Sequence, residues 1–582
     1  MVIPTTIRKN SRVHSWFNRE KESIRLPMIL EIALCLVVIL ELLAPFVSTS
    51  YGLDARLHLN WISQFRTLIS EGVLVPRWVP SGFYGFGAAT FYFYPPVTFY
   101  MAAIIGCLTS ITSATVLFQT VSFLMTIGSF LTARLFLRSI GSQGYQMNLG
   151  AVLYSIAPFR IVELYHRGAL PTHVAYVFIP IVWLELVAIM RPDACIGDNK
   201  PRWKHIVVLG TSSALLALTS VPVTLVTMIC IGTAALAVWR KIRLTVLWDY
   251  IMAAGLATVL TAFHFSAVIT ADSFARVNEM IGIYPKTEFS SLLVGINWLY
   301  VYHLFFVYIP PVLIGLAFWK LRISDMSDST DPETLLARVG LILLIVITYL
   351  NILPLSRVVW NTLLPFQLIQ FGFRFFSHFV LLAATMVGIA RSTAMKRAAY
   401  AATWFVVIGA IPPAILIVFN LHIYSHFTAP PEDSPEYRPV FTVALDGFKQ
   451  TMERHAADPL TSFANVQSNE GLQLDAKLPT SQVFDVTIDT QKTVTFHQFY
   501  WPFWHLYANH REIPSHPDSI GRAVAVLPAG HYTATWQLER TPLEYAGLWI
   551  SGITWSGVLI FWGIGLVRQR VKKKIPIPSD LD

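Results

Sequence analysis

Apolar segments long enough to cross a membrane recur along most of this 582-residue chain, separated by short polar connectors. Because a helix needs about 20 apolar residues to span a bilayer core, the pattern predicts a polytopic α-helical membrane protein with about 12 spans. We expect these spans near residues 26–47, 97–137, 145–160, 174–190, 206–221, 223–239, 249–269, 299–319, 335–351, 375–391, 398–419 and 546–567.

Two features set the expected orientation of these spans. Basic clusters at 240–243, 320–322, 391–397 and 568–574 fall on alternate connectors, which predicts that both termini lie in the cytoplasm. Residues 95–138 must then cross an odd number of times. They read as two helical pieces, 97–110 and 114–137, and we expect one full span and one shorter re-entrant piece.

The pattern changes between residues 420 and 545. Charged and proline-punctuated stretches alternate apolar with polar residues, as in VFDVTIDT (483–490) and KTVTFHQFYW (492–501), which is typical of strands joined by turns. The predicted organisation is therefore a cytoplasmic segment (1–25), a transmembrane domain (26–419) whose first extracytoplasmic loop is 48–96, an extracytoplasmic β-rich domain (420–545), a last span (546–567) and a basic tail (568–582).

Composition agrees with a membrane location, since 54% of the residues are hydrophobic and only 13% are charged. The basic residues behind the net charge of +9 lie in the short connectors between apolar segments. The expected partner is therefore the lipid bilayer and not a nucleic acid. The 4 cysteines show no paired spacing that would indicate a disulfide framework or a metal site.

The densest chemistry lies in the first loop. A helix from residue 54 to residue 72 would place Asp54 and His58 on the same face as Trp61, Phe65 and an apolar stripe. A carboxylate and an imidazole held against apolar surface can act as acid or base, whereas the simpler alternative makes Asp54 a helix cap and His58 a buried interfacial histidine. The sequence does not decide whether Asp54 and His58 bind a divalent metal, since no second acidic residue follows Asp54 at close spacing.

Three arginines, Arg77, Arg167 and Arg374, stand in or beside extracytoplasmic turns. Guanidinium groups bind phosphate bidentately, so the three together could hold a lipid phosphate, although each alone could also reach up to headgroups. The supporting candidates are Glu163, which we expect to pair with Arg167, His166, Asp272 as a cap or second acid, and Tyr92 and Tyr94 of FYFYPP (91–96), as a stacking surface or an interfacial aromatic belt.

Several motifs carry a resemblance to a known family. The first loop with Asp54 is similar to the first extracytoplasmic loop of type-C glycosyltransferases. A narrower group, the bacterial membrane proteins labelled 6-pyruvoyl-tetrahydropterin synthase-related, which resemble the YfhO-like family, matches more closely. The motifs are D-x3-H-x2-W-x3-F (54–65), PRW (76–78), G-x2-GFG with FYFYPP (82–96), YHRGA (165–169), LPFQLIQFGFRFF (364–376) and EYRP (436–439). The chain departs from the pattern after Ala169, where Leu170–His173 replace an expected acidic residue.

The resemblance implies a bacterial inner-membrane glycosyltransferase. It would move a sugar from a polyprenyl-phosphate donor to a glycan, lipid or protein acceptor with inversion, with Asp54 as base, His58 orienting Asp54 or the donor, and Arg77, Arg167 and Arg374 on the phosphate. Two other functions stay open, a lipid or polysaccharide transporter and a non-catalytic envelope assembly protein.

Overall fold

The computed structural model describes residues 53–190, 201–239, 242–277, most of 340–350, 356–390, a few helical residues between 396 and 408, 434–442, 472–478 and 480–574. The predicted spans at 26–47 and 299–319, most of the span at 398–419, the N-terminal segment and the end of the tail lie outside the described residues.

Apolar helices build the larger part of the described chain. Five are long and apolar enough to cross a membrane, by length and composition: α5 (Ala114–Ser139), α8 (Leu170–Met190), α10 (Val221–Val238), α11 (Leu244–Ala271) and α22 (Pro542–Lys574). Shorter helices α4 (Val97–Thr109), α6 (Gly144–Ser155), α9 (Arg202–Ala217) and α19 (Phe376–Gly388) pack among them. The count of about 12 spans, which includes segments outside the described residues, stays a prediction.

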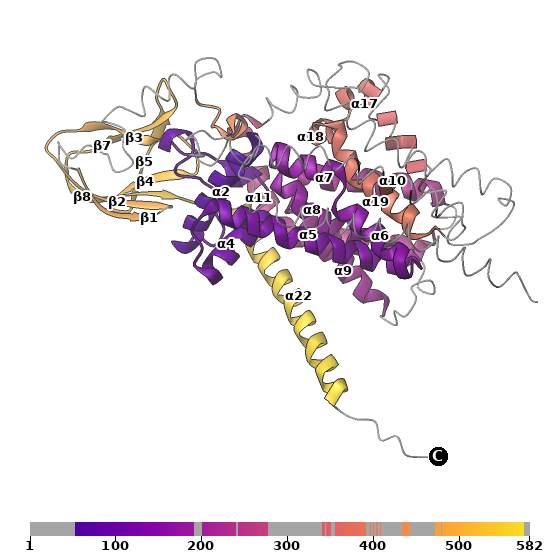
Figure 1. Cartoon of the computed structure of the whole chain (residues 1–582). Helices are drawn as coiled ribbons and strands as arrows, with labels where there is room; N and C mark the ends of the chain where they lie inside the picture. Colours follow the sequence, from indigo (N-terminus) through magenta and orange to yellow (C-terminus); the bar gives the residue numbers. More distant parts are fainter. Residues whose placement is uncertain are drawn as a thin grey trace, which may run out of the picture.

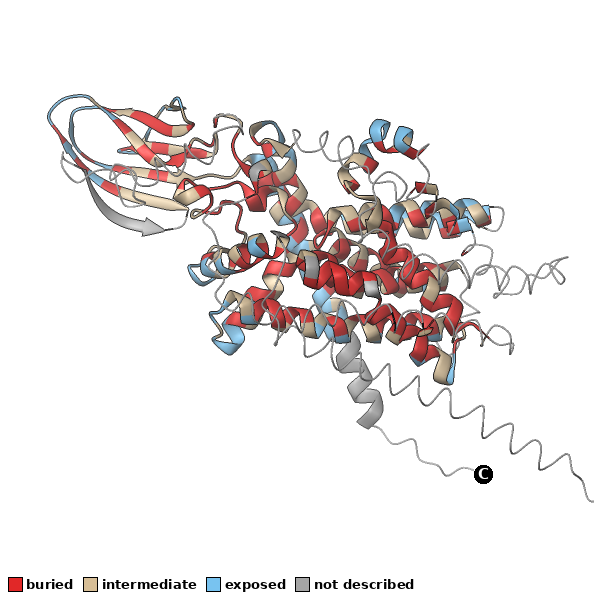
Figure 2. Cartoon of the chain, turned by 45° about the horizontal axis from the view of Figure 1, so that its top comes forward, coloured by how far each residue is buried: buried red, intermediate tan, exposed pale blue. Residues whose placement is uncertain are grey.

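The helices pack in a connected series. α5 contacts α8 and α6, α6 contacts α19, and α9 joins α8 to α11, which in turn packs along α22. Buried residues concentrate through the middle of this bundle (Figure 2). The two helical pieces expected between 95 and 138 are α4 and α5, and they separate where Ser110 adopts a left-handed conformation and Ser113 caps the next helix.

The connector at 161–173, between the spans expected at 145–160 and 174–190, reads from its sequence as a short polar turn. This prediction is wrong, because the chain stays helical through most of the connector. After α6 ends, the short helix α7 (Pro158–Val162) and a π-helical turn η2 (Glu163–Arg167) continue to Gly168, and α8 starts two residues later. The apolar positions of this stretch face the bundle, which keeps it helical. This stretch places two polar side chains, Glu163 and Arg167, at the edge of the helical bundle.

Residues 472–538 form the predicted β structure, as two antiparallel sheets. One sheet has the order β1-β2-β8-β4-β5 and the other β3-β7-β6. Phe496 joins the sheets, since its ring stacks on Trp536 at 4.5 Å and meets Phe484 edge-on at 6.2 Å. The strands are β1 (Leu472–Leu478), β2 (Ser481–Ile488), β3 (Lys492–Phe499), β4 (Trp504–Ala508), β5 (Arg511–Ile513), β6 (Ser515–Pro517), β7 (Arg522–Leu527) and β8 (Gly530–Leu538).

The β domain sits at one end of the molecule, against the first loop and next to α2 (Leu53–Ser70) and α4 (Figure 1). The backbone N–H of Phe499 donates to the carbonyl of Phe86 at 2.7 Å, and their rings stack at 5.3 Å. Tyr92 is fully buried and packs on Trp501 at 5.3 Å. The run FYFYPP is therefore partly core between loop and β domain, and Tyr92 does not present a surface for a sugar or a lipid tail.

Candidate active site

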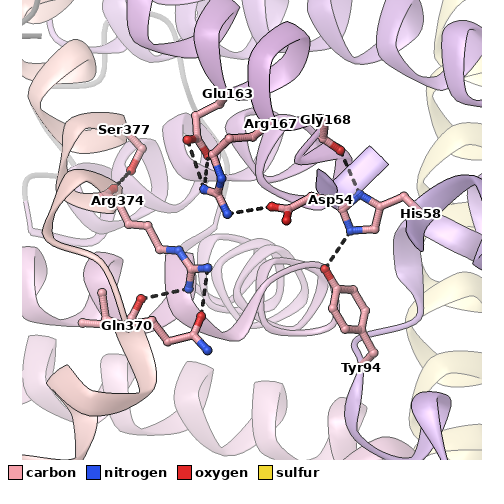
Figure 3. Close-up of polar contacts among 10 residues, drawn as sticks. Asp54, His58, Tyr94, Glu163, Arg167, Gly168, Gln370, Arg374 and Ser377 are labelled. Carbon is pink, nitrogen blue, oxygen red and sulfur yellow. Dashed lines mark hydrogen bonds and ion pairs between the residues drawn. The ribbon is translucent and has the colours of Figure 1, made fainter. Parts of the chain in front are cut away.

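An ion pair joins two parts of the chain that the sequence separates by 113 residues. Asp54 lies in the first turn of α2, where the helix dipole favours a negative charge. The Nη2 of Arg167 donates to Oδ2 of Asp54 at 2.7 Å (Figure 3). The Asp54 side chain is 37% exposed, so a molecule arriving from solvent can reach it. Its second oxygen, Oδ1, accepts no hydrogen bond from the residues that the structure describes.

Glu163 holds Arg167 from the other side, as expected. The Nη1 of Arg167 lies 3.1 Å from Oε1 and 3.0 Å from Oε2 of Glu163. Burial alone would lower the pKa of Arg167, but the carboxylates of Glu163 and Asp54 outweigh burial and raise the pKa above its ordinary value. The guanidinium is therefore a permanent cation, held by two carboxylates.

Gly168 allows α2 to approach Arg167 closely. Its φ is +72°, a conformation that other residues adopt at a cost, and a Cβ at this position would lie 2.2 Å from the Cβ of Ala55. The contact brings the first turn of α2 directly against the residue that follows Arg167. A larger residue at either position would move Asp54 away from its cation.

His58 fixes the same junction by two hydrogen bonds. Its Nδ1 donates to the carbonyl of Gly168 at 2.8 Å, so Nε2 carries no proton and accepts from the hydroxyl of Tyr94 at 3.0 Å. Burial lowers the pKa of His58, although the charge of Asp54 opposes this, and the neutral imidazole matches the bonding pattern. His58 makes no hydrogen bond to Asp54 among the described residues, so it positions the backbone next to Arg167 instead of orienting Asp54 directly.

Arg374 brings a second cation to the cluster from η9 (Gly372–Phe375). Its Nη1 donates to the carbonyl of Ile369 at 2.9 Å and its Nη2 to Oε1 of Gln370 at 3.1 Å. These neutral partners leave the positive charge of Arg374 without an ion pair among the described residues. Burial lowers the pKa of Arg374 to about 10, and the charge of Arg167 adds to this effect, so Arg374 is still a cation at neutral pH.

Two phenylalanines hold the two cations side by side. The rings of Phe371 and Phe373 stack at 5.0 Å with an interplanar angle of 9°. The guanidinium carbon of Arg167 lies 5.6 Å and 5.1 Å from their centroids, and that of Arg374 lies 5.4 Å from Phe371. Cation–π contacts thus offset part of the repulsion between the arginines. Neither ring was a predicted site residue, although both belong to the motif that contains Arg374.

Arg77 and Tyr92 lie elsewhere, contrary to the expectation that three arginines converge. Arg77 is 5% exposed, forms an ion pair with Glu544 at the start of α22, and donates to the carbonyl of Glu539 at 3.3 Å. Its guanidinium carbon lies 5.0 Å from the ring centroid of Tyr92. Both side chains are therefore committed to joining the first loop, the end of the β domain and the last helix.

The remaining predicted residues take other places. Asp272 is exposed at the end of α11 and makes no capping hydrogen bond in η5 (Asp272–Phe274). The backbone of His166 belongs to η2, and its side chain lies outside the described residues. No group of three or more His, Cys, Asp and Glu side chains that could hold a metal occurs among the described residues.

Arg160 was not predicted as a polar site residue. It lies inside the bundle at 1% exposure, donates from Nε to Nδ1 of His173 at 3.3 Å, and donates to the carbonyls of Ser155 at 2.9 Å and Met125 at 3.3 Å. These bonds fix the break between α6 and α7, one helical stretch before Arg167. His173, which stands in the departure after Ala169, serves this structural cluster.

No protein-family model and no curated protein matches the sequence. Several solved structures show a distant likeness, and three of them illustrate it.

Arabinofuranosyltransferase AftD from Mycobacteria is 14% identical, with a TM-score of 0.41, and the match covers 69% of this chain and 27% of that one. The oligosaccharyltransferase of Archaeoglobus fulgidus in the apo form is 13% identical, with a TM-score of 0.40, over 76% of this chain and 66% of that one. ArnT from Cupriavidus metallidurans bound to undecaprenyl phosphate is 10% identical, with a TM-score of 0.40, and the match covers 85% of this chain and 97% of that one.

This chain thus spans about a quarter of the length of AftD and two-thirds of the oligosaccharyltransferase.

Proposed function

We propose that this protein is a membrane glycosyltransferase that moves a sugar from a polyprenyl-phosphate donor to an acceptor at the extracytoplasmic face, with inversion. One observation carries the proposal: a half-exposed carboxylate, Asp54, lies beside two cations, Arg167 and Arg374, that share one phenylalanine stack. Such an arrangement can bind a phosphate and activate a hydroxyl within the same site. The likeness of the first-loop motif to type-C glycosyltransferases supports the choice of a sugar donor.

The charges of the site suit this reaction. A sugar phosphodiester carries one negative charge, and the departing polyprenyl phosphate gains a second when the bond between the anomeric carbon and the phosphate oxygen breaks. Arg167 and Arg374 stabilise that developing charge. The phosphate competes with Asp54 for Arg167, which frees the carboxylate to take the proton of the acceptor hydroxyl while its oxygen attacks the anomeric carbon.

The proton and the electrons balance in this scheme. Asp54 loses its negative charge on protonation, and the phosphate gains one as it leaves, so the total charge of the site does not change during transfer. Glu163 keeps Arg167 in place after Asp54 has released it. The transition state would resemble an oxocarbenium ion, by analogy with glycoside hydrolysis.

The decisive experiment is an analysis of lipid-linked sugars in cells that lack this protein and carry either the wild type or Asp54→Asn. We expect one polyprenyl-phosphate sugar to accumulate in the deletion strain and with Asp54→Asn, because the variant keeps the shape of the side chain and loses the base. Glu71→Gln, an exposed carboxylate at the end of α2, is the matched control and should restore the wild-type profile.

A wild-type lipid profile with Asp54→Asn, in a strain where the deletion itself changes the envelope, would contradict the proposal. That result would favour an envelope assembly protein, because such a protein needs no base. Quantifying both proteins in the membrane fraction separates loss of activity from loss of folding.

A further inference from the structure

A short segment that precedes the β domain in the chain crosses next to the candidate active site. Residues 434–442, here called the strap, contain the one-turn helix η10 (Pro435–Tyr437). The strap was part of a predicted motif, but none of its residues had a predicted role. Three neighbouring parts of the chain hold it in place.

The first contact is with the loop that carries FYFYPP. The N–H of Ala89 donates to the carbonyl of Tyr437 at 3.2 Å, and the Tyr437 ring stacks on Phe93 with an interplanar angle of 12°. The same ring meets Trp61 edge-on at 5.9 Å and Tyr94 at 6.2 Å. Tyr437 is thus packed against the tyrosine that holds His58, so the strap touches the side chains that build the site.

The second contact is with the end of α11. Nη2 of Arg276 donates to the carbonyls of Val440 and Thr442, both at 2.9 Å. Ala275 forms an isolated antiparallel bridge with Pro439. These bonds satisfy the backbone of the strap as a sheet would, so its position is defined by the fold.

The third contact is with the β domain. The ring of Phe441 meets that of Tyr500 edge-on at 4.9 Å. Gly521, with a φ of +95°, lies so close that a Cβ there would come within 2.9 Å of the carbonyl oxygen of Phe441. The strap therefore connects the β domain physically to the site.

The strap carries one acidic residue, Glu436. Its side chain is half-buried in η10, directly before Tyr437. Burial raises the pKa of Glu436, hydrogen bonds from Ser434 and from its own backbone oppose this, and the negative charge of Asp54 raises the pKa further. Both carboxyl groups also act on the pKa of Tyr94, which burial raises. Asp54 and Glu436 thus influence the same hydroxyl group and each other.

We propose that Glu436 is an acceptor-binding residue, and that the acceptor is a neutral polyhydroxylated glycan. This inference rests on the proposed function. While Asp54 takes the proton of the reacting hydroxyl, the carboxyl group of Glu436 hydrogen-bonds a neighbouring hydroxyl of the same sugar. Once the donor phosphate occupies Arg167 and Arg374, two carboxyl groups at the acceptor position repel a second phosphate group, whereas sugar hydroxyls can donate to both carboxyl groups. Phe93, which is partly exposed and stacks on the buried ring of Tyr437, offers aromatic surface to a sugar ring next to Glu436.

The experiment compares Glu436→Gln with Asp54→Asn, wild type and the Glu71→Gln control in two measurements. The first is the amount of polyprenyl-phosphate sugar in cells that lack the chromosomal copy. The second is binding of farnesyl phosphate, used as a donor probe, to the purified full-length protein in detergent. We expect Glu436→Gln to lower transfer by about tenfold or more, so that the donor accumulates, and to bind farnesyl phosphate within about twofold of wild type.

Each other outcome overturns the inference in a different way. If Asp54→Asn accumulates donor and Glu436→Gln does not, Glu436 has no role in transfer and the proposed function stands. If Glu436→Gln loses farnesyl phosphate binding, Glu436 supports the donor side or the fold. If neither variant accumulates donor, the proposed function fails and this inference fails with it.

The acceptor class has its own measurement. Wild-type envelope material that carries the sugar missing from the deletion strain is treated with mild acid, which cleaves glycosyl phosphates and spares glycosides. We expect the sugar to resist release. Release by mild acid would show a phosphate acceptor and would overturn the acceptor class.

Discussion

Two arginine sites in this molecule use the same side chain for different purposes. Arg77 and Glu544 are 5% and 1% exposed, and their ion pair closes the junction of loop, β domain and last helix. Arg167 is 24% exposed and its partner Asp54 37%, and Arg374 binds only neutral groups among the described residues. Both sites carry cation–π contacts, so aromatic packing does not distinguish them. The two sites differ in solvent exposure and in whether each cation is matched by a carboxylate.

The difference shows what an arginine near a membrane can do. A cation whose partner is buried with it holds the structure together, because separating the pair leaves an uncompensated charge inside. A cation whose partner is open to solvent can exchange that partner for a ligand. The second arrangement is the one we assign to phosphate binding.

The largest expected effect comes from breaking the buried pair. Arg77→Met should lower the free energy of unfolding by about 3–5 kcal/mol, since Glu544 would stay buried without its cation. Arg374→Met should cost only about 1–2 kcal/mol, and should weaken farnesyl phosphate binding by about tenfold or more. Thermal unfolding and probe binding of the purified variants measure both.

The double variant Arg77→Met/Glu544→Met is the matched control, and it should recover most of the lost stability. If Arg77→Met unfolds no more easily than Arg374→Met, the contrast between the two arginine sites is mistaken. The same conclusion would follow if Arg77→Met bound the probe as weakly as Arg374→Met while folding normally.

A smaller effect is expected from Gly168→Ala, which tests how the exposed site is held together. The new Cβ would clash with Ala55 and force α2 away from Arg167, at a cost of about 1–3 kcal/mol. Gly72→Ala is the control, because Gly72 also has a positive φ, +90°, and a Cβ there would have no neighbour within 4 Å. Only Gly168→Ala should also lower sugar transfer. Equal losses of transfer in both variants would mean that the contact with Ala55 does not position Asp54.

Acidification should give the smallest effect, through His58. Its pKa is lowered in the folded protein from the ordinary 6.5, so the unfolded chain binds the extra proton first as the pH falls. The stabilising contribution of neutral His58 is present above pH 6.5 and is lost as the pH falls toward the folded pKa, with a slope of at most about 1.4 kcal/mol per pH unit. Unfolding of wild type and His58→Gln between pH 7.5 and pH 5, as an approximate range, compares the slopes. His58→Gln should have the shallower slope, and identical slopes would show that His58 does not titrate with unfolding.

Some of this structure follows directly from sequence pattern. Period-two alternation located β2 and β3, and continuous apolar runs located α5, α8 and α10, because burial on one face or on all faces leaves a local signature. The helix at Asp54 and the pair of Glu163 with Arg167 are also local, since four residues separate the members of the pair.

The contacts that assemble the site are not local. Nothing in VPRWVP distinguishes Arg77 from Arg374, because the partner that buries Arg77 lies 467 residues away. The same holds for the strap that carries Glu436, because Arg276 and Tyr500, which hold the strap in place, are distant from it in the sequence. The polar residues between the spans expected at 145–160 and 174–190 also indicated a short turn, where the structure has the π-helical turn Glu163–Arg167. No finding bears on the narrower resemblance to the 6-pyruvoyl-tetrahydropterin synthase-related group, which stays a prediction.

The pair between Arg77 and Glu544 also has a consequence for biosynthesis. Synthesis at about 5–20 residues per second adds Glu544 to the chain roughly 20 to 90 s after it adds Arg77. For that interval the first loop has its cation and lacks the carboxylate that will bury it. The first loop therefore completes its packing only after α22 has been synthesised, although the loop itself is made early.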